Sequence, residues 1–243
     1  MADPALTLTA WLRYDLIRRL LARADGVRTV LEIGTGQGAL GARLAERYAY
    51  TGLELDETSF RIAASRIESR GGRVIHGDVA QLPADTVFDL VCAFEVLEHI
   101  EDDRTVLRAW RARLGTGGWL LLSVPGFARR FGPWDVKAAH YRRYEREGLA
   151  ELIKAAGFES PLVWAYGFPL GNLTEAVRHW VAGRGPNNSS MDERTRASGR
   201  ALQPTDRWGW LTRLISAPFR PLQRPFRETH LGVGLVALAR RRD

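Results

Sequence analysis

The 243-residue chain has one cysteine and no long apolar run, and each of these absences narrows what the protein can be. Cys92 alone cannot form an intrachain disulfide, and its apolar neighbours predict a buried core residue. The longest apolar runs, near Trp119–Val124 and Leu231–Ala239, are far shorter than a membrane-spanning helix. Because the N-terminus also has no signal-peptide pattern, we expect a soluble, cytoplasmic protein. The length suits one α/β domain with an appendage.

The net charge of +7 is concentrated at one end of the chain. Residues 178–243 contain 13 Lys+Arg against 5 Asp+Glu, whereas residues 1–177 contain 22 against 23. An acidic substrate, a membrane surface or RNA would be attracted to this basic segment. A solvated basic surface without a partner is an equal alternative.

The most informative stretch joins an apolar run, Thr29–Ile33, to glycines at alternate positions, Gly34, Gly36 and Gly38. This order predicts a buried strand and a tight turn, and the next residues, Ala39–Arg47, have helical spacing. Such a turn places backbone N–H groups and a positive helix end beside a small anionic ligand. The same spacing also matches a dinucleotide-binding pattern or a purely structural turn.

An acidic residue follows the turn at the distance expected for ribose binding. Glu54 lies in the second predicted strand, Tyr48–Leu55, 20 positions after Gly34. A carboxylate suits this task because both vicinal hydroxyls of ribose are donors. Asp56 competes for the role, but its position predicts the start of the next helix, Ser59–Arg70.

Strands and helices alternate along the chain, which predicts a parallel, doubly wound sheet. The third predicted strand, Arg73–His76, leads to Asp78, whose carboxylate could accept a hydrogen bond from the adenine amine. The N-terminal helix, Leu8–Ala24, is either a packing helix or a flap over the ligand site. The other predicted elements are strands Val87–Phe94, Trp119–Val124 and Pro161–Ala165, helices Asp103–Leu114 and Glu147–Ala156, and a turn at Gly115–Gly118.

Together these segments resemble the class I S-adenosylmethionine (AdoMet)-dependent methyltransferases, over about residues 28–165. The motifs that carry the resemblance are Val30–Gly38, Gly52–Leu55, Gly77–Val79, Phe88–Val91 and Leu114–Leu120. Thr116 departs from the family, which often has proline there. A dehydrogenase is disfavoured because a second nucleotide-binding half is not evident.

The resemblance implies a seven-stranded Rossmann-like sheet and a set of cofactor-binding residues. Glu32 and the glycine turn would hold the methionine end of AdoMet, Glu54 the ribose, and Asp78 with the Val79 amide the adenine. The full set of cofactor-binding residues is Glu32, Gly34, Thr35, Gly36, Gly38, Glu54, Leu55, Asp78, Val79, Phe94 and Glu95.

A cluster of acids and histidines follows the fourth predicted strand. Glu95, Glu98 and His99 have the spacing of one helical face, and His140 lies further along the chain. The cluster resembles ubiquinone-biosynthesis O-methyltransferases. It also resembles small-RNA 3′-end 2′-O-methyltransferases, in which two glutamates and two histidines hold a divalent ion. That resemblance implies these four residues as ligands of Mg²⁺, Mn²⁺ or Zn²⁺.

Two other interpretations of the cluster stay open. His140 or His99 could act as a metal-free general base, or the acids could simply cap the helix and pair with arginines. The arginines near His140 could clamp an acidic substrate or lie on the surface; they are Arg142, Arg143 and Arg146.

The methyltransferase resemblance also implies a last, antiparallel strand, for which Leu231–Ala239 has the apolar pattern. The 65 residues before it predict an insertion. We expect a core at 1–166, a basic lid-like insertion at 167–229, and the last strand with a basic tail at 230–243.

Within the insertion, Asn172 and Glu175 predict a capping box for a helix that ends at Ala182. Gly183–Arg200 is polar and predicted to be mobile. Thr205–Phe226 interleaves tryptophans with arginines, and its prolines exclude one long helix. A substrate lid, a membrane-surface anchor at 205–227 and an RNA contact all fit this pattern.

The sequence therefore favours an AdoMet-dependent methyltransferase that acts on a hydroxyl of a small or lipophilic molecule. The alternatives are a 2′-O-methyltransferase of RNA ends and an AdoMet-binding module without catalysis. In-line methyl transfer would depend on holding the acceptor and the sulfonium in near-attack geometry.

Overall fold

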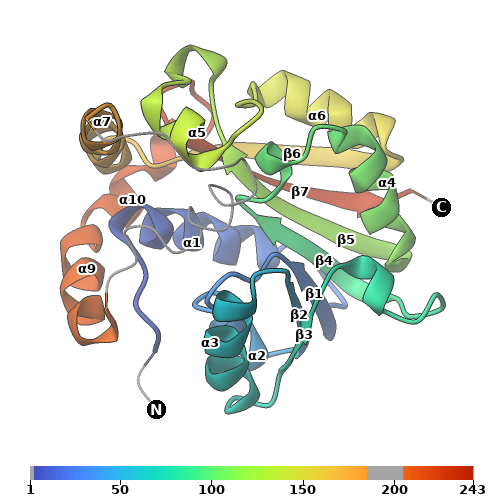
Figure 1. Cartoon of the computed structure of the whole chain (residues 1–243). Helices are drawn as coiled ribbons and strands as arrows, with labels where there is room; N and C mark the ends of the chain where they lie inside the picture. The colour runs from blue at the N-terminus through green and yellow to red at the C-terminus, as the bar shows by residue number, and fades with distance from the viewer. Residues whose placement is uncertain (1–2, 185–204, 243) are drawn as a thin grey trace.

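The computed structural model describes residues 3–184 and 205–242 of the chain, shown in Figure 1. The predicted mobile segment Gly183–Arg200 lies almost wholly outside the described residues. Within the described part, no helix has the length and apolar character needed to cross a bilayer.

A single seven-stranded sheet forms the centre of the molecule, as predicted (Figure 1). Its strand order is β3-β2-β1-β4-β5-β7-β6; β7 is antiparallel to both of its neighbours and the other pairs are parallel. The strand order reverses between β1 and β4, and α/β folds bind ligands at the carboxyl ends of the strands beside such a reversal. The strands are β1 (Thr29–Ile33), β2 (Ala49–Glu54), β3 (Arg73–His76), β4 (Phe88–Phe94), β5 (Leu114–Pro125), β6 (Phe158–Tyr166) and β7 (Gly234–Arg241).

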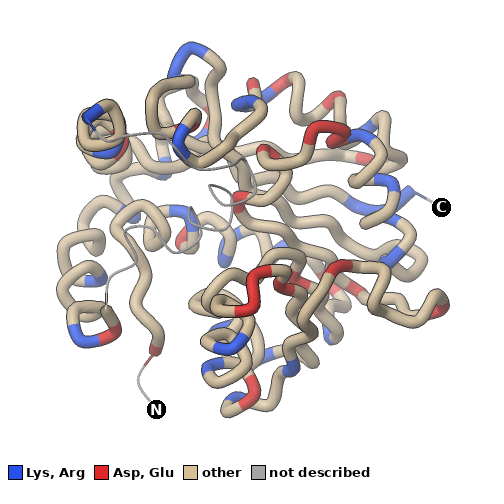
Figure 2. Tube along the Cα trace, viewed as in Figure 1, with Lys and Arg blue, Asp and Glu red and all other residues tan. Residues whose placement is uncertain are grey.

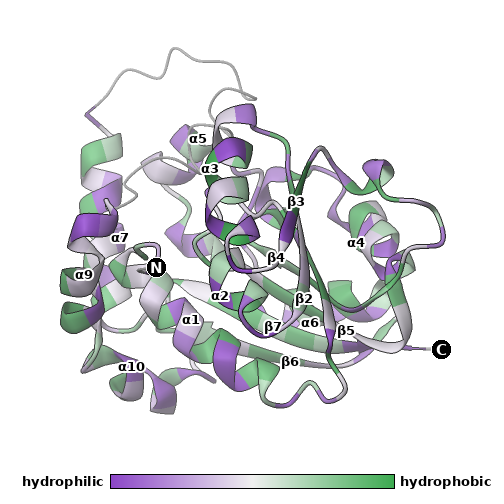
Figure 3. Ribbon diagram, turned by 90° about the horizontal axis from the view of Figure 1, so that it is seen from below, coloured by the Kyte–Doolittle hydropathy of each residue, from purple (hydrophilic) through white to green (hydrophobic). Residues whose placement is uncertain are grey.

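Helices cover both faces of the sheet, and each face has its own apolar cluster (Figure 3). One cluster includes Leu107 of α4 and Leu149 of α6, and the other includes Leu16 of α1 and Ile67 of α3. Cys92 is fully buried in β4, as predicted. The helices outside the insertion are α1 (Leu8–Leu21), α2 (Gly41–Ala45), α3 (Glu57–Glu68), α4 (Asp103–Ala112), α5 (Pro133–Ala138) and α6 (Arg146–Ala155).

Two local predictions are wrong. The predicted turn Gly115–Gly118 is part of β5, which begins at Leu114 and pairs irregularly with β4. The predicted capping box is not formed, because α7 (Leu170–Ala182) begins before Asn172 and has no side-chain cap. Glu175 therefore lies within the helix, where it is buried and ion-paired.

The chain between β6 and β7 packs on α1. Thr212 Oγ1 donates to the Leu6 carbonyl at 2.7 Å, and Gln223 Nε2 donates to the Leu12 carbonyl at 2.9 Å. In the described part of 205–227 no helix exceeds eight residues, as the prolines predicted. After α7, its elements are η4 (Asp206–Trp208), α9 (Gly209–Ser216), α10 (Phe219–Leu222) and η5 (Arg224–Phe226).

Candidate active site

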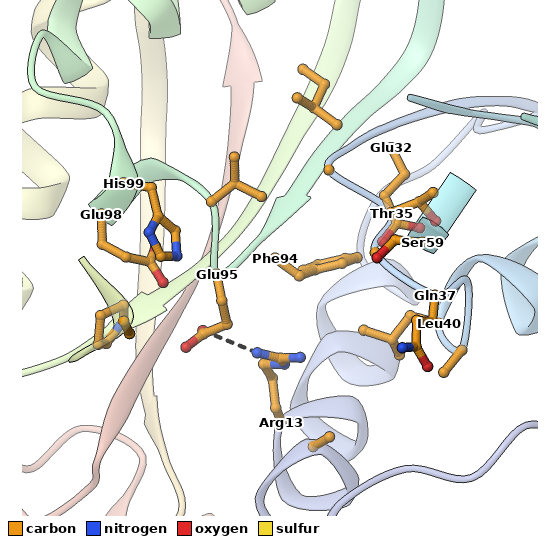
Figure 4. A pocket seen from close by; sticks show the side chains of 18 of the residues that line it. Arg13, Glu32, Thr35, Gln37, Leu40, Ser59, Phe94, Glu95, Glu98 and His99 are labelled. Carbon is orange, nitrogen blue, oxygen red and sulfur yellow. Dashed lines mark ion pairs between the residues drawn. The ribbon is translucent and has the colours of Figure 1, made fainter. Parts of the chain in front are cut away.

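A cavity of about 1100 Å³ lies at the carboxyl ends of β1 to β4 (Figure 4). Typical small-ligand pockets measure about 300–1,000 Å³, so this one has room for a cofactor and a second molecule. We distinguish a glycine-turn half, around Gly34–Gly36, from a histidine half, around His99 and His140. The helix α1 and the insertion also line the cavity, through Thr9, Arg13, Thr174, Arg178 and Thr212 among others. Whether α1 or the insertion moves as a flap or lid stays a prediction.

The glycine turn exposes backbone to the cavity. Gly36 has a φ of +56°, and a Cβ placed on it would meet no atom within 4 Å. Gly38 differs, because its Cβ would lie 2.9 Å from the Cα of Ala63, and Gly38 does not line the cavity. Gly38 therefore serves the close packing of the turn against α3.

The Glu54 carboxylate is positioned by two backbone N–H groups. Its Oε2 accepts from Gly36 N at 2.7 Å and its Oε1 from Asp56 N at 2.9 Å. Each oxygen keeps a further acceptor site, so the pair can accept two vicinal hydroxyls. Asp56 caps α3 by accepting from Ser59 N at 3.0 Å, as the sequence predicted.

Glu32 is an almost fully buried acid at the end of β1, 2 % exposed. Its Oε2 accepts a hydrogen bond from the Tyr50 hydroxyl at 2.6 Å. Burial raises the pKa of Glu32 to about 8, although the Tyr50 hydrogen bond and Arg13 act in the opposite direction. A buried acid in this setting favours a cationic ligand group, which would restore its ionised form.

The other predicted cofactor residues line the same half of the cavity. Asp78 Oδ1 accepts from Ala80 N at 2.9 Å, which fixes the carboxylate at the end of β3. The sequence predictions missed Gln37 and Ser59, which also line the cavity (Figure 4). A glutamine in a glycine turn, or a serine in the first turn of a helix, does not by itself predict a ligand contact from the sequence. The predicted residues found here are Glu32, Gly34, Thr35, Gly36, Glu54, Leu55, Asp78, Val79 and Phe94.

Glu95 lies where the two halves meet, with a φ of +59° that is uncommon for a residue with a Cβ. Its Oε1 lies 3.1 Å from Arg13 Nη1 and accepts from the hydroxyls of Ser123 at 2.9 Å and Tyr166 at 3.1 Å (Figure 4). Burial would raise the pKa of Glu95, but Arg13 and Ser123 outweigh it and lower that pKa. Oε1 of Glu95 is therefore engaged by three donors of the protein. Arg13 and Tyr166 were not predicted, because they come from α1 and β6.

Three of the four predicted metal ligands are brought together. Glu98, His99 and His140 each offer a ligand atom, and these atoms lie within 4.8 Å of one another. Glu95 is not part of this group. Glu98 is 0 % exposed and neither of its carboxylate oxygens has a hydrogen-bond partner; His99 Nδ1 also lacks one. Unpartnered buried polar atoms are costly, so their occurrence at one point indicates a ligand site.

Burial sets the charge of this cluster. It raises the pKa of Glu98 well above its ordinary value, and the nearby Glu95 adds to the effect. Burial also lowers the pKa of His99 to about 4, with His140 contributing, so that His99 is neutral near pH 7. The ring centroids of His99 and His140 are 4.8 Å apart.

His140 is oriented by a buried carboxylate. Asp135 Oδ1 lies 2.8 Å from His140 Nδ1, and Asp135 is 0 % exposed. The hydrogen bonds from His140 and Arg143 outweigh burial and lower the pKa of Asp135. An ionised carboxylate only accepts, so Nδ1 carries a proton toward Asp135, and Nε2 is the ring nitrogen left to act as an acceptor. That Nε2 lies 3.9 Å from Glu98 Oε1.

The predicted arginine clamp is occupied by protein groups. Arg143 donates to Asp135 from Nε and Nη2 at 2.8 Å and to Glu175 from Nη1 at 2.6 Å. Arg142 is paired with Asp103, and Arg146 with Glu147; neither lines the cavity. Arg143 therefore ties the insertion helix α7 to the loop that bears His140.

The fold and the site define an AdoMet-dependent methyltransferase of class I. The glycine turn, the acid at the end of β2 and the antiparallel last strand are the features that define it. A family described as a methyltransferase domain matches residues 9–161, so the chain belongs to this family.

Relatives and solved structures agree with this assignment. An uncharacterised methyltransferase of Mycobacterium tuberculosis is 32% identical over 163 residues, which cover 65% of this chain and 80% of that protein. A ubiquinone biosynthesis O-methyltransferase of Bordetella avium is 34% identical over 118 residues, 46% of this chain and 48% of that protein. The structure of Haemonchus contortus phosphoethanolamine N-methyltransferase 2 with S-adenosyl-L-methionine has a TM-score of 0.60 at 17% identity, covering 95% of this chain and 53% of that one.

Proposed function

We propose that the protein transfers the methyl group of AdoMet to a hydroxyl oxygen of a small or lipophilic acceptor. AdoMet would lie in the glycine-turn half, with its ribose on Glu54, its adenine at Asp78 and the Val79 amide, and its methionine end near Glu32. AdoMet supplies an electrophilic methyl group when bound. The acceptor would then occupy the histidine half.

The observation that carries the proposal is the buried arrangement of Glu98, His99 and His140. A hydroxyl is a weak nucleophile until it loses its proton, so its methylation benefits from a base at the acceptor. His140 Nε2 can accept this proton, because Asp135 holds the opposite ring nitrogen. His99 is neutral and can accept a hydrogen bond. Relatives named as O-methyltransferases support an oxygen acceptor.

The same three side chains fit a divalent ion. Glu98 has two free oxygens in a fully buried position, and one carboxylate with two imidazoles is a donor set for Mg²⁺, Mn²⁺ or Zn²⁺. Glu98, His99 and His140 would hold the ion, and Asp135 would orient His140 behind it. Such an ion, when bound, lowers the pKa of a hydroxyl group.

Product identity tests the acceptor atom. The purified full chain is incubated with AdoMet and ring-matched acceptors, catechol and o-phenylenediamine, and the products are identified by mass spectrometry. We expect O-methylation of catechol and about a 10²-fold lower kcat in His140→Gln. His230→Gln, at an exposed histidine outside the cavity, is the control. Methylation of nitrogen alone, or an unaffected His140→Gln, would overturn the proposal.

Direct titration tests the ion separately. Chelator-treated protein is titrated with MgCl₂, MnCl₂ and ZnCl₂ in a calorimeter, and its thermal unfolding is followed in parallel. At least one ion should bind and raise the unfolding temperature of the wild type, and Glu98→Gln should lose both effects. Equal heats in the two proteins, or none in either, would leave His140 as a base that acts without an ion.

A further inference from the structure

Two helices of the insertion carry large apolar side chains on the outside of the molecule. On α7 they recur at helical spacing, and a second group follows from η4 into α9. Their side chains are between 43 % and 64 % exposed. We call this set the α7–α9 surface; it consists of Leu173, Val177, Trp180, Val181, Trp208, Trp210, Leu214 and Ile215.

Other side chains of the same helices pack against the N-terminal part of the protein. Thr174 Oγ1 lies 2.9 Å from Thr9 Oγ1 of α1, and Thr212 Oγ1 donates to the Leu6 carbonyl at 2.7 Å. Ser216 is fully buried.

Trp210 and Leu214 are each two positions from Thr212 and therefore lie on the opposite side of α9 from the Thr212 contact. On α7, Leu173 and Val177 are each two positions from the buried Glu175 and lie on the side opposite to it. Figures 1 and 3 place both helices at the same end of the molecule, beyond α1.

All the tryptophans with largely exposed side chains lie on this surface. The chain has eight tryptophans, and three of them are exposed: Trp180 at 62 %, Trp208 at 53 % and Trp210 at 62 %. Tryptophan concentrates at the boundary between lipid headgroups and acyl chains, where its apolar ring and its N–H donor are both accommodated. Exposed apolar side chains that gather on neighbouring turns of a helix, as they do on α7, are typical of an interaction site.

The charges around the surface are positive. Arg184, Arg207 and Arg213 are exposed, and Figure 2 shows basic positions (blue) on both helices. The two acids of these helical segments are engaged elsewhere: Glu175 is buried against Arg143, and Asp206 is paired with Arg66 at 2.9 Å. Among the described residues, the α7–α9 surface therefore presents apolar side chains and exposed arginines, and its one exposed acid, Asp206, is paired with Arg66.

We propose that the α7–α9 surface binds the headgroup region of an anionic lipid bilayer. Arginines attract anionic headgroups, and the adjacent tryptophan, leucine and valine side chains bury in the acyl boundary. Since no described helix can span a bilayer, the contact is interfacial. A nucleic-acid contact could use the tryptophans and arginines for stacking and charge, but it would leave the aliphatic side chains Leu173, Val177 and Leu214 without a partner, whereas a bilayer buries them as well.

Vesicle binding by the full chain tests this proposal. Co-sedimentation uses phosphatidylcholine vesicles with and without phosphatidylglycerol, and brominated phosphatidylcholine reports on tryptophan depth. Wild-type protein should bind the anionic vesicles at least about tenfold better than the neutral ones, and brominated lipid should quench its fluorescence. Replacing Trp180, Trp208 and Trp210 by phenylalanine should remove the quenching. Absence of vesicle binding, or binding to RNA instead, would overturn the proposal.

Paired variants locate the contact. Leu214→Gln with Trp210→Gln should weaken vesicle binding by about tenfold or more, whereas Val87→Gln, at another exposed apolar residue, should not. Arg207→Gln with Arg213→Gln should weaken it about fivefold per arginine. Arg104→Gln with Arg108→Gln, on the exposed side of α4, is the charge-matched control. S-adenosylhomocysteine binding confirms that each variant is folded. Equal losses in the control variants would contradict a localised surface.

Discussion

Replacing Gly36 by alanine separates the ligand-binding role of the glycine turn from its role in the fold. Gly36 has a φ of +56°, and the space next to its Cα is open toward the cavity. Gly26, with a φ of +73°, is equally open and lies outside the cavity. An alanine in this left-handed region costs about 1–2 kcal/mol. We therefore expect Gly36→Ala and Gly26→Ala to lower the free energy of unfolding by similar amounts, which urea denaturation measures.

The two variants should differ in ligand binding. A methyl group on residue 36 would occupy the space in which the cofactor approaches the backbone. Forcing an extra methyl group into a filled site costs about 1–3 kcal/mol, which corresponds to roughly 5–150-fold weaker binding. Gly26→Ala should keep the wild-type affinity for S-adenosylhomocysteine within about twofold.

Calorimetric titration with S-adenosylhomocysteine measures the affinity of both variants for this ligand. If Gly36→Ala binds as tightly as Gly26→Ala, the ligand does not approach the turn at this residue and the assignment of the glycine-turn half is refuted. A third variant, Gly38→Ala, tests the packing role of the turn. Its Cβ would lie 2.9 Å from the Cα of Ala63, so it should lose more stability than either of the others.

Three further predictions concern glutamates. Glu175→Gln should lower the free energy of unfolding by about 2–3 kcal/mol in urea denaturation, because its buried carboxylate accepts from Arg143 at 2.6 Å; an unchanged midpoint would mean that water reaches the pair, and exposed Glu147→Gln is the control. The raised pKa of Glu32 means that the unligated fold is most stable with Glu32 protonated, so stability should fall between about pH 4.5 and 8. The unfolding temperature of Glu32→Gln should change less with pH over this range than that of the wild type. An unchanged pH dependence would argue against the raised pKa of Glu32. Glu54→Gln should weaken S-adenosylhomocysteine binding about tenfold or more in calorimetry, and full retention would exclude the ribose contact.

Local sequence signals predicted the parts of the site that follow from one strand and its turn. Glu54 and Asp78 were predicted because a parallel sheet brings the carboxyl ends of its strands to one edge; spacing from the glycine turn identified Glu54, and the position after the third strand identified Asp78. Asp56 was assigned to a helix start because short acidic side chains cap helices, and it does so. Each of these predictions depends only on residues that lie close together in the sequence.

The groups that arrange the histidine half have no such signal. Arg13 comes from α1, Tyr166 from β6 and Glu175 from α7, and only the fold brings them together. The capping-box prediction for Glu175 failed for the same reason. A buried ion pair with Arg143 outweighs the weak preference of a glutamate for the first turn of a helix. Glu95 is likewise not grouped with the other predicted metal ligands, and Arg13 pairs with its carboxylate instead.

One helix, α7, takes part in both the cavity and the α7–α9 surface. Its inner face carries Glu175, which holds the arginine that fixes Asp135 and thereby His140. Its outer face carries Leu173 and Val177, which are 64 % and 53 % exposed. Because the two faces are separated by the body of a 13-residue helix, their functions should be separable. Leu173→Gln with Val177→Gln should weaken vesicle binding and spare methyl transfer in solution, whereas Glu175→Gln should lower kcat and spare vesicle binding. Loss of both activities in both variants would instead mean that α7 is only a structural support.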